Sequence, residues 1–350
     1  MNKKRKTFFP SNQPRKFEPP VTSFLDIMVD HREFESIIRI TNQKVNIVEE
    51  LRRSMDEIKA ARGNYVVAYL SNVVNQSIKA NISINDTDDK PFEELIATVP
   101  ADVKELDFII LTPGGNGTQV AKFVDKLRPR FDKVTFIVPN IAMSAGTILV
   151  MSGDDIIMTP TSYIGPIDPQ VPNKDGMYIP AQAILTLVSE IQERGQVKLS
   201  KGQQPDWTDL QILRQIDPKE IGNAINGSKY SVELVENYLF DYKFKSWTTH
   251  SSTGQPVTPD EKRVRAKKIA EKFCNHKDWK SHSRGISREV AWNVCQLKIR
   301  HSEEFPGLDR AIRRFWALLC WTFENSGVYK TFLSKEYSLM RIDNSLMKRI

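Results

Sequence analysis

The sequence predicts an α/β protein in which βαβ units build a mostly parallel sheet. Three observations support this class: short apolar runs recur along the chain, each run ends at turn-forming residues, and helical segments separate the runs. Apolar runs of this length are typical of strands buried on both faces, and their alternation with helices favours parallel pairing. The expected strands are 65–70, 106–111, 134–138 and 155–158.

Helices are expected between these strands. Pro91 suits the first turn of a helix over 92–96, because proline lacks the N–H that this turn leaves unpaired. Two more helices are expected from about 118 to 127 and from 144 to 151. Together these elements predict one core domain over 64–245.

The segments flanking the core are expected to be largely helical. Apolar residues recur at three- and four-residue steps over 21–63, and Gly63 is a natural stop, which predicts one long amphipathic helix. A helical extension is expected over 246–350, completing the core and forming an interface. Its stretch 311–323 is apolar almost all round, so burial in the core or an interface is expected.

Composition bounds the functional class. The 350 residues carry a net charge of +7, and basic residues at 3–6 and 15–16 supply much of the surplus. Residues 1–20 are therefore expected to be a basic disordered arm, either merely solvated or in weak contact with nucleic acid or acidic membrane. The three cysteines form no disulfide framework, and we find no signal peptide or membrane-length apolar run, so a cytoplasmic protein is expected.

Ser144 is the strongest candidate for chemistry. It follows the expected strand 134–138 and precedes the small residues that open the next helix, a geometry that lifts a serine beside free backbone N–H groups. A glycine-rich turn over 113–117 ends the preceding strand. Each turn also has a plainer interpretation: Ser144 as a helix N-cap, and the glycines as an ordinary turn or a phosphate cradle, although the dinucleotide fingerprint is absent.

Three motifs occur in order: Leu-Thr-Pro-Gly-Gly at 111–115, Met-Ser-Ala-Gly at 143–146 and Ile-Gly-Pro-Ile-Asp-Pro-Gln at 164–170. Over roughly 65–300 the chain resembles the Clp-protease/crotonase superfamily. It is most similar to the serine dehydrogenase proteinases, themselves similar to signal peptide peptidase A. The resemblance implies a Clp/crotonase-like spiral of βαβ units. It also implies that Ser144 is the nucleophile and that Gly114, Gly115 and Ala145 form the oxyanion hole.

The catalytic base does not follow from the resemblance. Clp proteases place a histidine after the strand that follows the serine helix, and 160–168 contains none. Relatives of signal peptide peptidase A use lysine, for which Lys201 and Lys229 are candidates if burial lowers the pKa. His282 is the other candidate, as a base, as a group that positions one, or as a structural hydrogen-bonding residue. Asp168 would either orient a base or fix a loop.

We therefore predict a serine endopeptidase that works through a Ser144 acyl-enzyme with a lysine or histidine base. A catalytically weak scaffold for protein interactions is the alternative, and an acyl-CoA enzyme is a third interpretation. The expected substrate is a peptide or a partly unfolded protein, and the expected assembly is a homo-oligomer. No cofactor or metal is expected, because the spacing of Cys274, His276, His282 and Cys295 fits no standard zinc module.

Overall fold

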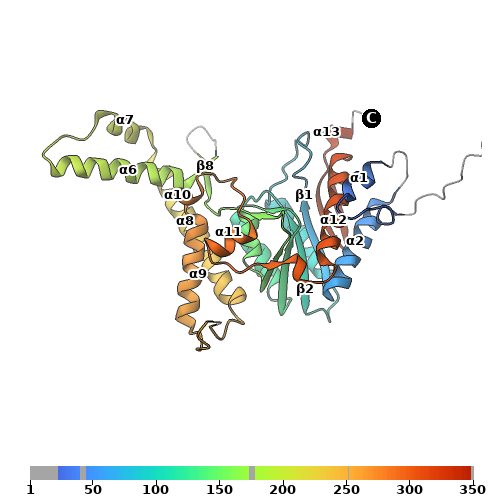
Figure 1. Ribbon diagram of the computed structural model, residues 1–350. Coiled ribbons are helices and arrows are strands. Elements are labelled where there is room, and N and C mark those ends of the chain that lie inside the picture. Colours follow the sequence, from blue (N-terminus) through green and yellow to red (C-terminus); the bar gives the residue numbers. More distant parts are fainter. Residues whose placement is uncertain (1–22, 40–44, 173–177, 251, 348–350) are drawn as a thin grey trace, which may run out of the picture.

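A seven-stranded sheet forms the centre of the protein. The computed structural model describes residues 23–39, 45–172, 178–250 and 252–347 (Figure 1). Across the sheet the strand order is β11 (Ser338–Ile342), β10 (Val328–Ser334), β1 (Tyr65–Ser71), β2 (Glu105–Leu111), β3 (Lys133–Val138), β5 (Asp155–Met158) and β9 (Arg300–His301).

From β1 to β9 all neighbouring strands run parallel, whereas β10 is antiparallel to both β1 and β11. The four strands expected from apolar runs are all present. The predicted α/β class with a mostly parallel sheet is therefore confirmed. Because parallel strands end at one edge, the turns after β2 and β3 lie side by side, as the sequence argument requires.

The alternation of side chains along the strands divides the core in two. On β1, Val67 and Tyr69 face one cluster, whereas Val66, Ala68 and Leu70 face the other. Successive side chains of a strand point to opposite faces of the sheet, so a strand that is apolar at every position needs cover on both sides. All seven residues of β1 are buried. The sheet is therefore a central layer between two helical layers.

One face is covered by α3 (Asp89–Ala97), α4 (Gly117–Leu127), α5 (Ala145–Val150), α8 (Pro218–Tyr238) and α9 (Pro259–Cys274). The stacked rings of Phe92 and Phe123, with centroids 3.9 Å apart, join α3 to α4 at the centre of this layer. Both side chains are fully buried, and each contributes about 1.5–3 kcal/mol through burial.

The other face is covered by α1 (Glu33–Ile38), α2 (Ile47–Arg62) and α12 (Leu308–Glu324) (Figure 1). The prediction of one helix over 21–63 is wrong: residues 23–32 are not helical, and α2 begins afresh at the N-cap Asn46, whose side chain accepts from the Glu49 N–H. Gly63 ends α2 in the left-handed conformation, as expected.

The C-terminal part is not purely helical, which corrects the expectation for 246–350. Strands β9, β10 and β11 join the central sheet, and β10 pairs with β1. The buried Lys330 interrupts the apolar pattern of β10, and this is why the strand is not evident from the sequence. Helix α12 is buried against α2 and the sheet, which confirms the expected burial of 311–323.

A helical hairpin projects from the body of the molecule (Figure 1). It consists of α6 (Ala181–Ser200) and α7 (Trp207–Gln215), and two hydrogen bonds from the Arg194 guanidinium to the Asp209 carboxylate join them. The remaining elements are short: η1 (Asp86–Asp88), β4 (Ile141–Ala142), β6 (Tyr163–Ile164), β7 (Gln170–Pro172), β8 (Tyr178–Pro180), η2 (Leu239–Lys243), α10 (His276–Trp279), α11 (Arg288–Asn293), η3 (Ser302–Glu304) and α13 (Asn344–Met347).

The structure gives limited information on two further expectations, the basic arm and the absence of a membrane-spanning segment. The basic arm over 1–20 and its contacts lie outside the described residues. In the part of the chain that the structure describes, we find no helix with the length and apolar character needed to span a bilayer.

Candidate active site

The turns after β2 and β3 are joined by their backbones. The Thr112 N–H donates to the Ile141 carbonyl at 3.1 Å, and the Met143 N–H donates back to the Thr112 carbonyl at 3.1 Å. These two bonds form a small parallel bridge between Thr112 and Ala142. The glycine turn is thereby fixed against the turn that carries Ser144.

Gly114 makes the closest approach between the two turns. A Cβ at this position would lie 2.6 Å from the Met143 carbonyl oxygen and 2.7 Å from Ser144 Cβ. Both distances are shorter than van der Waals contact, and the φ of +105° also excludes most side chains. Glycine is therefore required here because Ser144 lies directly against the backbone.

Ser144 has a strained backbone, with φ 50° and ψ −118°. Non-glycine residues rarely adopt this conformation, which costs about 1–3 kcal/mol and is concentrated at functional sites. The residue occupies the N-cap position of α5, but its hydroxyl makes no capping hydrogen bond. Its side chain is partly exposed, so the plain N-cap interpretation does not explain this serine.

Small residues after Ser144 allow the helix to pack tightly. A Cβ on Gly146 would lie 2.4 Å from the Thr112 Cγ2. The Thr147 hydroxyl donates to the Ala142 carbonyl at 2.8 Å and accepts the Gly165 N–H at 2.8 Å. This threonine therefore ties the start of α5 to the loop that follows β6.

Two backbone N–H groups near Ser144 are available as donors. Within the described residues, neither the Gly115 N–H nor the Ala145 N–H donates to a protein acceptor. The Gly114 N–H, which the sequence suggested as a further donor, instead donates to Thr112 Oγ1 at 3.1 Å. The role of Gly114 is therefore steric, and Gly115 and Ala145 remain the candidate oxyanion donors.

Gly115 is held by a residue that the sequence did not indicate. The Ile84 N–H donates to the Gly114 carbonyl at 2.7 Å, and the Asn116 N–H donates to the Ile84 carbonyl at 2.9 Å. A Cβ on Gly115 would lie 2.3 Å from the Ile84 carbonyl oxygen. No local pattern predicts this contact, because it joins segments about thirty residues apart.

The structure brings His282 and Asp168 together. The imidazole Nδ1 lies 2.8 Å from Asp168 Oδ1. Asp168 is fully buried, whereas 20% of the His282 side chain is exposed. An ionised carboxylate only accepts, so this contact favours the imidazole tautomer that carries its proton on Nδ1 and its lone pair on Nε2.

The loop that carries Asp168 touches Ser144, and a backbone bridge joins the segment that carries His282 to the start of the same loop. A Cβ on Gly165 would lie 3.3 Å from the Ser144 nitrogen, and Asp168 is three residues further, at most about 11 Å along the chain. On the other side, Ile164 and Ile286 exchange two backbone hydrogen bonds, of 3.1 and 2.7 Å, and His282 comes four residues before Ile286.

The two candidate lysines lack the environment of a base within this chain. Lys201 is exposed at the far end of α6, on the projecting hairpin (Figure 1). Lys229 is exposed on α8. A lysine becomes a base near neutral pH when burial disfavours its charged form, and neither side chain is buried.

Two buried cysteines, Cys274 and Cys295, do not provide an alternative nucleophile. Burial, followed by the charge of Asp168, raises the pKa of the Cys274 thiol to about 12. Burial likewise raises the pKa of the Cys295 thiol to about 12. Both thiols therefore stay protonated near neutral pH, whereas nucleophilic cysteines react as thiolates. Among the described residues we find no cluster of three metal-ligating side chains.

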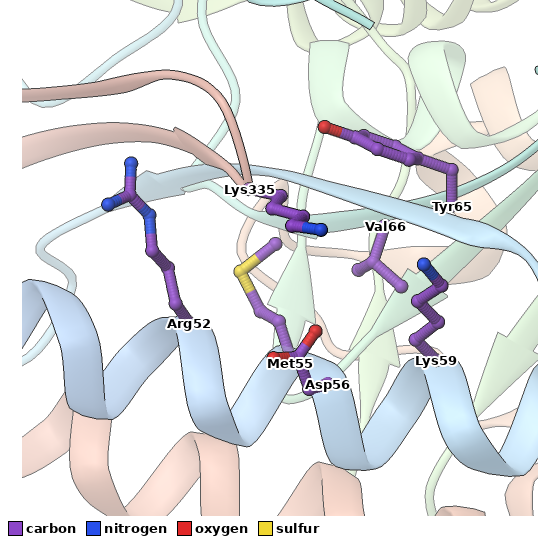
Figure 2. A pocket seen from close by; sticks show the side chains of 7 residues that line it. All are labelled: Arg52, Met55, Asp56, Lys59, Tyr65, Val66 and Lys335. Carbon is purple, nitrogen blue, oxygen red and sulfur yellow. The ribbon is translucent and has the colours of Figure 1, made fainter. Parts of the chain in front are cut away.

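Two hollows have linings that include none of Ser144, Asp168 and His282. One, of about 530 Å³, lies between α8 and α9 and includes Lys229 and Cys274 in its lining. The other lies between α2 and the start of β1, where Arg52, Lys59 and Lys335 surround an apolar floor (Figure 2). Its volume of about 30 Å³ admits no more than one or two water molecules, so it is too small for a peptide side chain of ordinary size.

The chain's family is shown by comparison with known proteins. The model of the ClpP-like SDH-type serine proteinases matches residues 22–200, about half of the chain. The chain belongs to this family. The match includes Ser144 and both turns but ends before His282.

Two curated relatives come from Methanocaldococcus jannaschii. Uncharacterized protein MJ1495 is 33% identical over 138 residues, which are 38% of this chain and 44% of the relative. Uncharacterized protein MJ0137 is 40% identical over 103 residues, which are 28% and 33% of the two chains. The chain thus spans less than half the length of either relative.

Two solved structures to which the chain shows similarity are titled as proteases. A membrane-bound stomatin-specific protease, 1510-N, in complex with a substrate peptide is 16% identical with a TM-score of 0.38, and the similarity covers 79% of this chain and 87% of that one. The ClpP protease catalytic domain of Plasmodium falciparum is 16% identical with a TM-score of 0.25, covering 36% and 62%.

Proposed function

We propose that the chain is a serine endopeptidase that cleaves peptide bonds through an acyl-enzyme on Ser144. The observation that carries the proposal is the His282–Asp168 pair, in which Asp168 belongs to the loop that contacts the strained serine. A serine hydroxyl becomes an effective nucleophile only when a base removes its proton, and a base works best when a third group orients it. Membership of a serine proteinase family agrees with this chemistry.

In the proposed mechanism Asp168 holds the imidazole of His282 with Nε2 facing Ser144. Nε2 takes the proton from Oγ as the oxygen attacks the substrate carbonyl carbon, and the imidazolium then gives that proton to the leaving amine. Water enters, loses a proton to Nε2, and attacks the ester carbon. The proton returns to Oγ as the carboxylic acid leaves, so the enzyme is regenerated.

Gly115 and Ala145 are the proposed oxyanion donors. The charge that forms on the carbonyl oxygen needs fixed donors, and removal of one such donor typically costs about 100- to 1000-fold in kcat. Both N–H groups border the Ser144 turn and donate to no protein acceptor in the described part of the chain. The close approach of Gly114 to Ser144 supports this placement.

Peptides or partly unfolded proteins are the proposed substrates, and a homo-oligomer is the proposed assembly. Leu199 and Trp207 on the projecting hairpin are 60% and 73% exposed. Large apolar side chains gathered on a projecting element are typical of contact surfaces. In an oligomer, contact with a neighbouring copy would bury Leu199 and Trp207. Lys201, on the same hairpin, would then lie close to that copy.

A fluorophosphonate probe tests the proposal. We expect the purified chain to be labelled at Ser144 and to release fluorescent peptides from fluorescein-labelled casein, and both signals to disappear in Ser144→Ala. A folded chain that neither reacts nor cleaves would instead favour a scaffold for protein interactions. Hydrolysis of an acyl-CoA thioester without casein cleavage would favour an acyl-CoA enzyme.

A further inference from the structure

A buried ion pair lies behind the glycine turn. The Lys330 Nζ lies 2.6 Å from Asp88 Oδ2, and both side chains are fully buried. Asp88 also accepts from the Tyr69 hydroxyl at 3.0 Å and from Arg341 Nη1 at 3.2 Å. These groups come from β1, η1, β10 and β11, so the pair joins the C-terminal strands to the loop after β1.

Hydrogen bonds of this pair hold the backbone on both sides of Ile84. The Lys330 ammonium donates to the Ser83 carbonyl at 2.7 Å, and Asp88 Oδ2 accepts the Asn85 N–H at 3.1 Å. Ile84 lies between these two anchors, and its own N–H and carbonyl bind Gly114 and Asn116. The ion pair is thus one residue away from the backbone that fixes Gly115.

Stability alone does not account for such a pair. Burial disfavours the charged ammonium and lowers the pKa of Lys330, and the hydrogen bond to Asp88 opposes this effect. Replacing a buried ion pair with apolar side chains of similar size is often neutral or stabilising. What charges at this position provide, and apolar side chains cannot, is directional bonding to the Ser83 carbonyl and the Asn85 N–H.

We propose that Lys330 and Asp88 are positioning residues that set the place of the Gly115 N–H through the backbone of Ile84. This inference rests on the proposed function, in which that N–H stabilises the oxyanion. A carbonyl oxygen held about 1 Å from its best position can cost on the order of 100-fold in rate, so a loosened Ile84 should impair catalysis without unfolding the protein.

The test combines Lys330→Met with a matched control, Lys243→Met. Lys243 also pairs with a strand aspartate, Asp155, at 2.9 Å, and its side chain is only 6% exposed. Asp155 begins β5, however, so this control lies at the sheet edge opposite Ser144. If Lys330→Met fails to fold, the double variant Lys330→Met with Asp88→Asn removes the pair without leaving a buried charge unpaired.

The position of the Gly115 N–H is monitored through one NMR signal. Gly114-Gly115 is the only Gly-Gly dipeptide in the sequence, so protein labelled with 1-¹³C,¹⁵N-glycine gives a single amide signal that is coupled to a ¹³C carbonyl. We expect this Gly115 signal to shift or broaden in Lys330→Met and to stay unchanged in Lys243→Met. An unchanged signal in every folded Lys330 variant overturns the proposal.

Catalysis is read from casein cleavage and from the rate of fluorophosphonate labelling. We expect Lys330→Met to lower kcat by about 10- to 100-fold with KM within about twofold, and Lys243→Met to keep both. Equal losses in the two variants overturn the positioning role. If the unaltered chain itself fails to react with the probe, the proposed function fails, and the Gly115 signal still supports or overturns the positioning of the amide.

Discussion

The Nδ1 of His282 lies 2.8 Å from Oδ1 of Asp168, although 114 residues separate the two in the sequence. The buried carboxylate holds a partly exposed imidazole. The loop that carries the carboxylate contacts Ser144, the only serine with a positive φ among the described residues. In the proposed mechanism this pair supplies the general base that activates the Ser144 hydroxyl. It also gives a specific explanation for the Pro-rich loop at 165–169, which carries the aspartate.

Removal of either member of the pair should slow catalysis. We expect His282→Ala and Asp168→Asn to lower kcat by roughly 1000- to 10,000-fold, because the first removes the base and the second favours the wrong imidazole tautomer. Casein cleavage measures the effect, and Lys201→Met serves as the control with full activity. Full activity of His282→Ala together with inactivity of Lys229→Met would instead identify a lysine base.

The backbone strain at Ser144 should make two inactive variants of this residue differ in their free energy of unfolding. Because glycine tolerates positive φ, we expect Ser144→Gly to unfold at higher denaturant than Ser144→Ala, by about 1 kcal/mol in the free energy of unfolding. Urea denaturation followed by circular dichroism measures the difference. A more stable alanine variant would show that the serine backbone is relaxed in solution.

A methyl group on Gly115 should impair both folding and catalysis. In Gly115→Ala the added carbon would meet the Ile84 backbone at 2.3 Å, so the turn must move, at a cost of about 1–3 kcal/mol. Gly222→Ala on α8 is the matched control, since nothing lies within 4 Å of its added carbon. We expect the control to be neutral or slightly stabilising in thermal unfolding and to keep its activity.

Acid should weaken the contact between Arg288 and Glu303. Hydrogen bonds from Arg288, opposed by partial burial, lower the pKa of Glu303 from 4.5 to about 2. The resulting stability is therefore fully present above pH 4.5 and disappears as the pH falls through about 2. Because 44% of the Glu303 side chain is exposed, we expect a contribution of about 1 kcal/mol or less.

Urea unfolding of Glu303→Gln at low ionic strength measures this contribution, because urea carries no charge that would screen the ion pair. The variant should be less stable than the unaltered chain at pH 7, and the two should converge as the pH approaches 2. A difference that stays constant from pH 7 to pH 2 would mean that packing, rather than charge, explains the effect. As a control, the free-energy difference caused by Glu303→Gln should be the same in a chain that also carries Asp343→Asn, because Asp343 makes no contact with Arg288.

The sequence predicts the parts of this fold that depend on local pattern. Strands such as β1 are buried on both faces, so their apolar runs are unambiguous. Strand β10 is not predicted, because a charged residue such as Lys330 is not expected inside a protein. Its burial depends on the ion pair with Asp88, which is distant in the sequence. The helix over 21–63 is overpredicted because apolar spacing continues through residues that the structure shows as turns.

In the candidate site, too, features that depend on local sequence are predicted and features that depend on distant contacts are not. Ser144 and the glycine turn belong to short motifs, so the sequence indicates them directly. His282 is evident only as a candidate, because nothing near it in the chain shows that Asp168 is its partner. The contact between the Ile84 backbone and Gly115 depends on tertiary packing alone, so no spacing of residue types in the sequence predicts it.

The place of β10 in the sheet has a consequence for biosynthesis. A ribosome makes this strand only after the segments that carry Ser144, Asp168 and His282. Until residue 330 emerges, the loop around Ile84 lacks the lysine that anchors it, and β1 has an open edge. If the proposed peptidase needs this anchor, the nascent chain stays inactive until β10 has been synthesised and has paired with β1.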